Sequence, residues 1–173
     1  MKRTTGLLAI AFATLCSPAA WSADDHVFVN PSEVKWGPAP PNFPKGAKLA
    51  VLYGDPGKAG PLVIRLQAPA NYKILPHWHT AAENLTVISG TLYLGDGDKM
   101  EMAKAHGLKA GGYHYLPAKA HHYAFTKTAT VVQANTQGPF DINYINEADD
   151  PSKAAAPAKA AEPAKKATEP AKK

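Results

Sequence analysis

The chain has 173 residues, of which 45% are hydrophobic and 19% are charged, and it contains 13 glycines and 16 prolines. This length accommodates one domain with flanking segments, and the glycine and proline content favours strands and turns over long helices. The formal net charge is +5, and the excess positive charge lies near the two ends of the chain. The central part of the sequence is nearly neutral, which argues against specific nucleic-acid binding.

Residues 1–23 have the order of features typical of a secretory signal peptide. Lys2 and Arg3 come first, an apolar run covers 6–16, and small residues follow. We therefore expect export to the periplasm or the extracellular space, and the apolar run is too short to anchor the chain across a bilayer. Cys16 is the only cysteine and lies in this segment, so the exported protein would have neither a disulfide nor a thiolate metal ligand.

Two further segments flank the central region. Residues 24–46 contain five prolines, which block helix formation, so we predict an extended arm that Trp36 and Phe43 anchor on a surface groove. Residues 148–173 form a low-complexity tail rich in Ala, Lys and Pro, which has no apolar face to bury and should be disordered. The tail either contacts an anionic envelope surface weakly or acts only as a solubilising segment.

The central region, residues 47–147, contains a series of short apolar runs separated by Gly and Pro turns. The predicted strands cover 48–53, 62–66, 84–94, 111–116, 123–126, 130–134 and 141–145. Residues 99–105 could form either a helical turn or a further strand. Short strands at this spacing predict an all-β domain built as a sandwich or a barrel.

The stretch from His77 to Glu83 carries the strongest chemical signal. Side chains two residues apart on a strand share a face, so His77 and His79 can point at one spot while Trp78 faces the other way. Glu83 has the same parity, and the apolar Leu85 continues it, as expected for a face turned to the interior. Buried His and Glu side chains need partners, and imidazole and carboxylate groups bind divalent metal ions, so we predict a metal site.

A further ligand should come from a distant strand, because metal sites in β folds close between strands. The candidates are the adjacent His121 and His122, of which one must face inward and the other away. Tyr123 and Phe125 share a face with His121, so the distribution of apolar residues does not settle the choice.

These residues resemble the two motifs of the cupin family. The first cupin motif has His-x-His, then Glu, then Gly, and the matching residues at the same intervals are His77, His79, Glu83 and Gly90. The second motif has Gly, then Pro-x-Gly, then His, and the matching residues are Gly111, Pro117 and His122. The resemblance covers residues 47–147 and implies that His122, rather than His121, is the fourth ligand.

Three positions depart from the family pattern. Asn71 stands where the first motif begins with Gly, Lys119 replaces the Gly of Pro-x-Gly, and Thr126 replaces a final Asn. The glycine that the family has at the position of Lys119 permits a tight turn with positive φ. The departures leave the predicted ligands intact and put the conformation of the loop before His122 in question.

The resemblance to small single-domain microbial cupins, and to the cupin half of zinc-dependent anti-sigma factors, implies a jelly-roll β-barrel that holds one divalent metal ion. Fe, Mn, Zn or Ni would fit the four ligands. Many cupins pair through their sheets, so the resemblance also implies a homodimer, which the arm could help to form.

The family implies no single reaction, so two functions stay open. One is a metal-dependent dioxygenase or isomerase that acts on a small molecule, and the other is a non-catalytic metal- or ligand-binding protein of the envelope. Aromatic and polar residues of the later strands are candidates for the pocket: Tyr113, Tyr115, His121, Tyr123, Phe125, Gln133 and Asn135.

Overall fold

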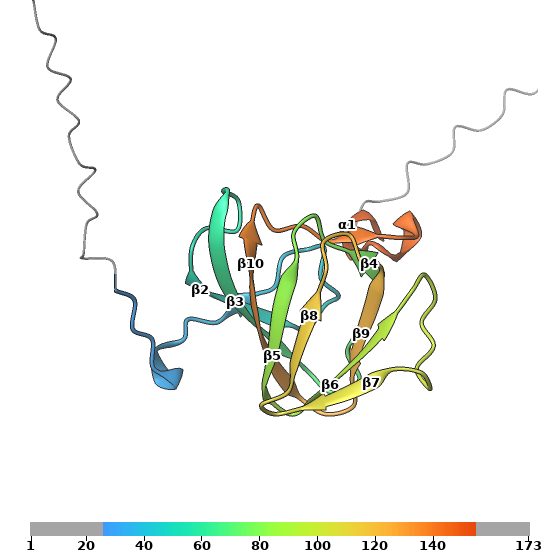
Figure 1. Ribbon diagram of the computed structural model, residues 1–173, viewed down its shortest axis with the longest axis horizontal. Helices are drawn as coiled ribbons and strands as arrows, with labels where there is room; N and C mark the ends of the chain where they lie inside the picture. Colours follow the sequence, from blue (N-terminus) through green and yellow to red (C-terminus); the bar gives the residue numbers. More distant parts are fainter. Residues whose placement is uncertain (1–25, 155–173) are drawn as a thin grey trace, which may run out of the picture.

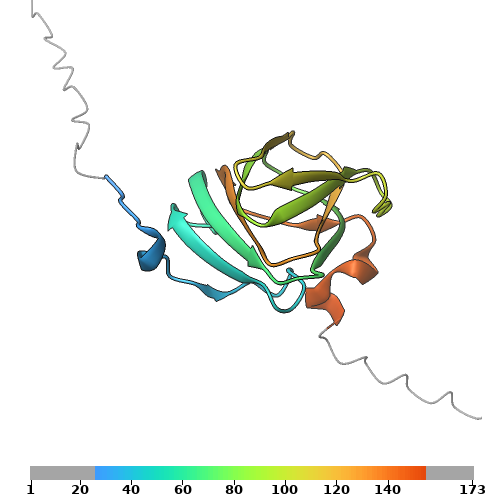
Figure 2. The same ribbon diagram turned by 90° about the horizontal axis from the view of Figure 1, so that it is seen from below.

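Two antiparallel β-sheets face each other in the computed structural model, which describes residues 26–154 (Figure 1 and Figure 2). The first sheet contains, in spatial order, β1 (Gly37–Pro38), β2 (Lys48–Tyr53), β3 (Gly60–Ala68), β10 (Thr130–Gly138), β5 (Glu83–Ser89) and β8 (Tyr113–Leu116). The second sheet contains β11 (Asn143–Tyr144), β4 (Lys73–Trp78), β9 (His122–Thr126), β6 (Thr91–Asp96) and β7 (His106–Lys109). Three short helical segments lie outside the sheets: η1 (Pro31–Glu33), η2 (Glu147–Asp149) and α1 (Pro151–Ala154).

The core lies between the sheets because inward and outward side chains alternate along the strands. In β10, Val132 and Ala134 are buried, whereas Gln133 between them is only half-buried. One buried cluster joins both sheets and includes Leu85 of β5 and Leu94 of β6. A period of two is the pattern expected for strands with one face on a core, and the prediction of an all-β sandwich is confirmed.

The single strand predicted at 84–94 is wrong, because it is two strands that belong to different sheets. β5 ends at Ser89 and β6 begins at Thr91, and Gly90 between them has a φ of +77°. A side chain at Gly90 would collide with Ala129 and Thr130, so the chain can turn here because this residue has no Cβ. Residues 99–105 contain a turn, in which the Lys104 N–H donates to the Glu101 carbonyl, rather than a further strand. β7 follows them as a strand that the sequence analysis missed.

The predicted arm is held on the domain at two points. β1 pairs with β2 through Gly37 and Pro38, and the side chain of Phe43 is only 6% exposed, within a second buried cluster that also contains Ile74 and Ile142. Phe43 is therefore part of the core rather than an anchor on a surface groove. Trp36 is half-buried.

The two ends of the chain are only partly covered by the structure. The predicted signal peptide at 1–23 and the predicted tail from residue 155 onward lie outside the described residues. The start of the tail, 148–154, includes the end of η2 and the short helix α1, which differs from the disorder expected there. Within residues 26–154, no helix has the length and apolar character of a membrane span.

The departures from the cupin motifs keep the backbone turns that glycine would favour. Asn71 has a φ of 59° and Lys119 has a φ of 62°, and among the described residues no other non-glycine residue has a positive φ. The backbone N–H of Lys119 donates to the carbonyl of His79 at 2.9 Å, which ties the turn before His122 to the first motif. Thr126, at the third departure, accepts a hydrogen bond from the backbone N–H of Tyr72. The Lys119 contact holds the turn at the predicted site, whereas the Thr126 contact lies at the opposite end of the β4–β9 pair.

Candidate metal centre

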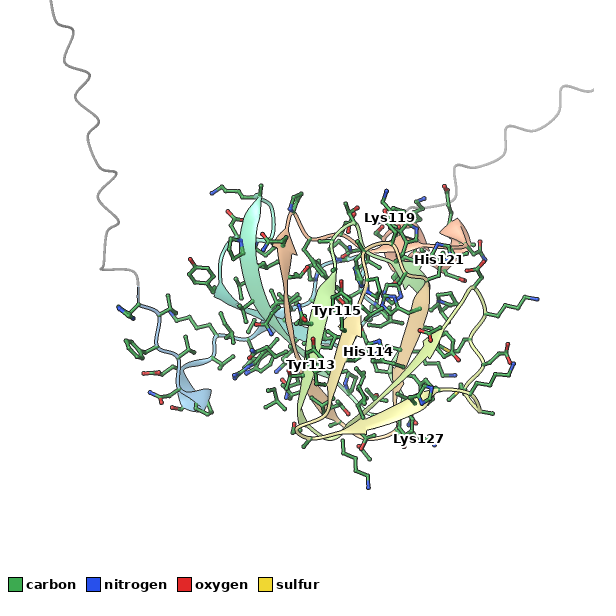
Figure 3. The ribbon with its side chains drawn as sticks, in the orientation of Figure 1. Tyr113, His114, Tyr115, Lys119, His121 and Lys127 are labelled. Carbon is green, nitrogen blue, oxygen red and sulfur yellow. The ribbon has the colours of Figure 1, made fainter. Side chains whose placement is uncertain are left out.

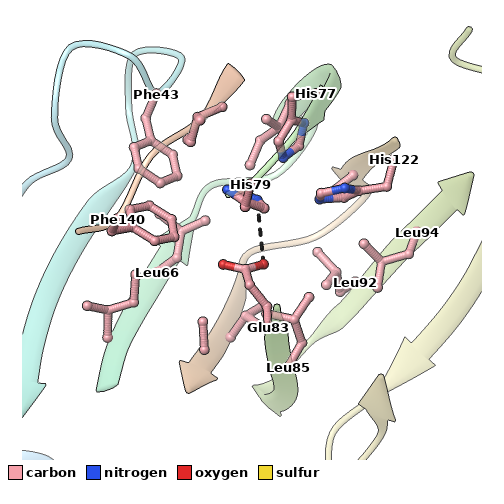
Figure 4. A pocket seen from close by; sticks show the side chains of 16 residues that line it. Phe43, Leu66, His77, His79, Glu83, Leu85, Leu92, Leu94, His122 and Phe140 are labelled. Carbon is pink, nitrogen blue, oxygen red and sulfur yellow. Dashed lines mark ion pairs between the residues drawn. The ribbon is translucent and has the colours of Figure 1, made fainter. Parts of the chain in front are cut away.

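The four predicted ligands line one cavity between the two sheets (Figure 4). His77 lies on β4 and His122 on β9, and the two residues are direct partners across these antiparallel strands. His79 follows the last residue of β4, and Glu83 begins β5 in the opposite sheet. All four residues are buried, with exposed fractions between 2% and 7%. The short segment 77–83 therefore brings side chains of both sheets into one space.

The three imidazole rings form a compact cluster. One ring nitrogen from each of His77, His79 and His122 lies within 4.8 Å of the other two. The ring centroids of His77 and His122 are 4.1 Å apart, and those of His79 and His122 are 5.2 Å apart. Nitrogen ligands at about 2.1 Å from one ion stand about 3 to 4 Å from each other, so a small movement of the rings would complete a three-histidine site.

His121 lies outside this cluster. Its side chain is 44% exposed, and its Nδ1 lies 2.6 Å from the carboxylate of Asp98, at the surface of the domain (Figure 3). The adjacent His122 is 3% exposed and joins His77 and His79. Of the two candidates left open by the alternation of side chains, the structure brings His122 to the site.

Glu83 approaches the cluster from the opposite sheet. Its Oε2 is 3.5 Å from Nε2 of His79 (Figure 4), while the group of donor atoms within 4.8 Å of one another contains only the three histidines. Burial raises the pKa of Glu83 because it removes water from the carboxylate, and His79 acts in the opposite direction. A cation would provide the charge partner that this buried carboxylate needs.

Hydrogen bonds turn the three rings so that the same nitrogen faces the cavity. Nδ1 lies 2.7 Å from the Leu75 carbonyl in His77, 2.5 Å from the Asp141 carbonyl in His79, and 3.1 Å from the Ala120 carbonyl in His122. A carbonyl oxygen only accepts hydrogen bonds, so each Nδ1 must carry a hydrogen and donate it. Each Nε2 is left with a free lone pair, which is how metal-binding histidines are commonly oriented.

Two of the buried rings, those of His77 and His122, are also held in the neutral form that binds metal. Burial, with a smaller contribution from the neighbouring imidazoles, lowers the pKa of His77 well below its usual value of 6.5. Burial and His79 lower the pKa of His122 to about 4. Because metal ions bind only the unprotonated nitrogen, protons do not compete for these two rings at neutral pH.

Asp141 is a residue of the site that the sequence analysis missed. Its backbone carbonyl accepts the hydrogen of His79 Nδ1, and its carboxylate accepts hydrogen bonds from the Thr80 backbone N–H at 2.8 Å and from the Asn143 side chain at 2.9 Å. Burial would raise the pKa of Asp141, but a hydrogen bond from the Thr80 hydroxyl, together with those from the Thr80 backbone N–H and Asn143, outweighs it and lowers the pKa. The aspartate fixes the segment that orients His79. Since 62 residues separate the two, no sequence spacing indicated this contact.

The cavity beside the cluster is small and apolar. Its volume is about 70 Å³, and among the described residues the only polar side chains in its lining are the four predicted ligands. The other lining residues are Phe43, Ile64, Leu66, Ile74, Leu85, Leu92, Leu94, Ala124, Val132, Ala134, Phe140 and Ile142. Since one water molecule needs about 10 to 15 Å³ by this measure, the space holds an ion with a few waters or a small ligand.

The pocket residues predicted on the later strands do not line this cavity. Tyr113 and Tyr115 project from β8 and are 58% and 53% exposed (Figure 3). Tyr123 and Phe125 are buried, but they alternate with His122 along β9 and so occupy its opposite face. The other predicted residues that are absent from the lining are His121, Gln133 and Asn135. The prediction followed polar and aromatic side chains of the later strands, whereas the cavity lining is mainly aliphatic, with Phe43 and Phe140 from other segments.

The donor set fits a divalent transition-metal ion. Neutral imidazoles suit Zn, Cu, Fe and Ni, and a carboxylate adds the negative charge that lowers the net charge of the site. Four protein ligands would complete a tetrahedral ion, whereas an octahedral ion would keep two positions for water or substrate.

The chain folds into two antiparallel sheets, and the histidines clustered between them come from both cupin motifs. These two features define the chain as a protein of the cupin fold. A family model described as "Domain of unknown function (DUF4437)" matches residues 8–143, and the chain belongs to this family. No curated protein matches the chain.

Solved structures with the same architecture support the assignment of the fold. The chain is similar to the polyketide cyclase RemF from Streptomyces resistomycificus, with a TM-score of 0.61, 16% identity, and coverage of 73% of this chain and 89% of that one. It is also similar to a predicted acetylacetone dioxygenase from Methylibium petroleiphilum PM1, with a TM-score of 0.58, 21% identity, and coverage of 75% and 87%. A cupin-2 domain from Rhodospirillum rubrum gives a TM-score of 0.52 at 12% identity, with coverage of 70% and 81%. These similarities confirm the cupin jelly roll.

Proposed function

We propose that this protein is an exported cupin that binds one divalent metal ion, namely Fe, Mn, Zn or Ni, through Nε2 of three histidines and the carboxylate of Glu83. The observation that carries the proposal is the common orientation of His77, His79 and His122, whose Nδ1 atoms all donate to backbone carbonyls. Three lone pairs then point into one buried space, which is the arrangement that histidine ligands of a metal ion adopt. Export follows from the signal-like order of residues 1–23.

The same site supports a metal-dependent oxygenase that acts on a small, mainly apolar molecule. The ion, when bound, would supply Lewis-acid or redox chemistry at the end of the cavity. The aliphatic and aromatic walls would enclose the hydrocarbon part of the substrate and exclude water, because within residues 26–154 no polar side chain other than the ligands lines them. An isomerase would need an acid–base group other than the metal ligands, and the cavity lining formed by residues 26–154 includes none.

Two of the similar structures have names that fit this class of chemistry. One is described as a predicted acetylacetone dioxygenase and the other as a polyketide cyclase. A small molecule that carries two neighbouring oxygen donors on an apolar skeleton would suit the cavity, because the donors could occupy the two positions that an octahedral ion keeps open.

A non-catalytic envelope protein that binds a metal or a small ligand is the second candidate, and the size of the cavity favours it. A volume of about 70 Å³ leaves little room beside a hydrated ion, and four protein ligands would saturate a tetrahedral zinc ion. Such a protein would store the ion or sense its concentration.

Elemental analysis of the protein purified from its own compartment tests the metal proposal. We expect about one equivalent of metal in the native protein and none in the double variant His77→Ala/His79→Ala. The matched control is His121→Ala, which removes an exposed imidazole beside a predicted ligand and should leave the metal content unchanged. A double variant that keeps its metal would refute the site.

The exchange of bound water discriminates between the two functions. Iron or manganese with two exchangeable waters, measured by water-proton relaxation of the manganese-loaded protein, would favour the oxygenase. Oxygen consumption on addition of a small dicarbonyl compound would then identify the activity. A zinc site without exchangeable water would favour the non-catalytic function.

A further inference from the structure

The four predicted ligands are buried, so an ion can reach them only through a wall of the cavity that moves. Their exposed fractions are 7% or less. Most of the other lining residues lie on strands of the two sheets, and opening a wall of strands would break backbone hydrogen bonds in the ladders. Among the described residues, the lining side chains that are neither ligands nor parts of a strand are Phe43, Phe140 and Ile142. The entrance is therefore expected beside one of these three.

Phe140 and Ile142 lie in a segment that cannot move without disturbing a ligand. Asp141 stands between them, and its carboxylate accepts a hydrogen bond from the Thr80 backbone N–H at 2.8 Å. The carbonyl of Asp141 is also the group that orients the ring of His79. An outward movement of this segment would release that ring, which leaves Phe43 as the wall that can open while the ligands stay in place.

Phe43 belongs to a loop that the ladders of the two sheets do not hold. Residues 39–47, called here the closing loop, connect β1 with β2 and contain turns in place of a helix or a strand. The backbone N–H of Ala39 donates to the carbonyl of Ala47 at 3.2 Å, so the two ends of the loop are joined. A loop with joined ends can move as one unit and can return to the same position.

Two tyrosine hydroxyls fasten the tip of the closing loop to the domain. Tyr144 donates to the Asn42 carbonyl at 2.9 Å, and Tyr72 donates to the Pro44 carbonyl at 2.7 Å. The two acceptors flank Phe43 in the sequence. Each bond is made by one side chain and contributes modestly to stability, so the tip is attached more weakly than a strand within a sheet.

The ring of Phe43 is the outer member of a stack that leads to the metal cluster (Figure 4). Its centroid is 6.3 Å from that of Phe140, and the Phe140 centroid is 5.3 Å from that of His79. The planes of each pair are nearly parallel, at 12° and 26°. Phe43 is 6% exposed, so its ring fills the part of the cavity next to the closing loop.

We propose that the closing loop is the entrance to the metal centre and that Phe43 is the specificity-determining residue that controls what reaches the ion. When the two tyrosine hydrogen bonds break, the loop withdraws the ring and opens the apolar end of the cavity. With the ring in place, the space of about 70 Å³ admits an ion and a few waters. This inference rests on the proposed metal site.

The kinetics of zinc exchange test the entrance. We expect the double variant Tyr72→Phe/Tyr144→Phe to raise the rates of zinc uptake and of zinc release by about 10- to 100-fold, because the closed loop loses two hydrogen bonds. The dissociation constant should stay the same, because a loop that closes equally over the empty and the loaded site changes both rates by one factor. Stopped-flow mixing with zinc and with a chelating dye measures the two rates.

The matched control for these rates is Tyr123→Phe. Tyr123 is also buried, lies next to the ligand His122, and donates its hydroxyl to the carbonyl of Glu101 at 2.7 Å, away from the closing loop. Its exchange rates should equal those of the wild type. Unchanged rates in the double variant, or equal increases in the control, overturn the entrance. A wild type that binds no zinc refutes the metal site instead, and the plug is then tested on the metal-free protein.

Benzene binding to the metal-free protein tests Phe43 as the plug. Apolar cavities of about 150 Å³ bind benzene, so Phe43→Ala should bind it in the space that the ring leaves. In NMR spectra of the folded variant, benzene should shift the ring signals of Phe140 and His79, whereas the wild type should show no such shifts. A folded variant whose Phe140 and His79 signals do not respond overturns the role of Phe43, whatever the metal content of the protein.

Discussion

Glu83 should destabilise the metal-free protein and stabilise the metal-bound protein, so replacing it should have opposite effects in the two forms. Its carboxylate is buried against an apolar cavity, with His79 at 3.5 Å as its one ion-pair partner among the described residues. The perturbation we consider is Glu83→Met, because methionine has a similar length and flexibility and fills the same space without a charge. Burial raises the pKa of Glu83, which shows that the ionised form is disfavoured at this position.

The size of the effect follows from removing a buried charge that has one weak partner. Replacing buried charged groups by well-packed apolar side chains commonly stabilises a protein by about 1 to 4 kcal/mol. A domain of this size melts about 3 °C higher for each kcal/mol, so the metal-free variant should melt about 3 to 12 °C above the wild type. A ligand at 100 times its dissociation constant stabilises the folded state by about 2.7 kcal/mol. The variant has lost one ligand, so it should gain much less from the metal.

Calorimetry in chelator and in excess zinc or manganese measures both forms. We expect Glu83→Met to melt above the wild type in chelator and to show the smaller increase when the metal is added. The matched control is Glu101→Met, because the Glu101 side chain is 50% exposed and pairs with Lys104 at the surface. The control should change stability by no more than about 0.5 kcal/mol.

Two results would refute this reasoning. If metal-free Glu83→Met melts below the wild type, then the carboxylate is not an unfavourable buried charge in the absence of metal. If the variant and the wild type gain equally from the metal, then Glu83 is not a ligand, and the three histidines bind the ion with water or another group.

Two further predictions concern the neighbours of the ligands. Asp141→Ala should weaken metal binding by about 10- to 100-fold, because the backbone at residue 141, whose carbonyl orients His79, is then no longer fixed by the carboxylate. Competition with a chelating dye would measure the affinity. An unchanged affinity would contradict the role of Asp141. Metal-free protein should lose stability as the pH falls from about 6.5 toward 4, because the unfolded chain protonates His122 near its usual pKa whereas burial lowers the folded pKa to about 4. This one group contributes about 3 kcal/mol over that window, and urea unfolding midpoints that stay flat or rise on acidification would contradict it.

The shared direction of His77 and His79 could be predicted from the sequence, because the direction of side chains along a strand depends only on their spacing in the sequence. A period of two places His77 and His79 on one face and Trp78 on the other, and the structure shows the two histidines buried and Trp78 half-buried outside their cavity. The choice between His121 and His122 could not be made from alternation alone, since the apolar Tyr123 and Phe125 share a face with His121. The structure decides it by the partner of each ring, which is Asp98 at the surface for His121 and the buried cluster for His122.

The walls of the cavity could not be predicted, because they depend on contacts between distant segments. Phe43 and Phe140 both line the cavity and stack with their ring centroids 6.3 Å apart, although 97 positions of the sequence separate them. The sequence predicts a surface position for Phe43 only because prolines surround it. Its burial follows from the pairing of β1 with β2, which leads the arm across one end of the sheets.

The turn before His122 shows why a departure from a family motif need not remove a site. Glycine is favoured in a left-handed turn because other residues lose about 1 kcal/mol or more there. Lys119 adopts this conformation with a φ of 62°, and its backbone N–H donates to the carbonyl of His79. That hydrogen bond is made by the main chain, so it does not require glycine, and it joins the segment before His122 to the segment that carries the other two histidines. The geometry of the three rings therefore depends on backbone contacts that are the same for Lys and Gly, and the substitution changes the stability of the turn rather than the position of the ligands.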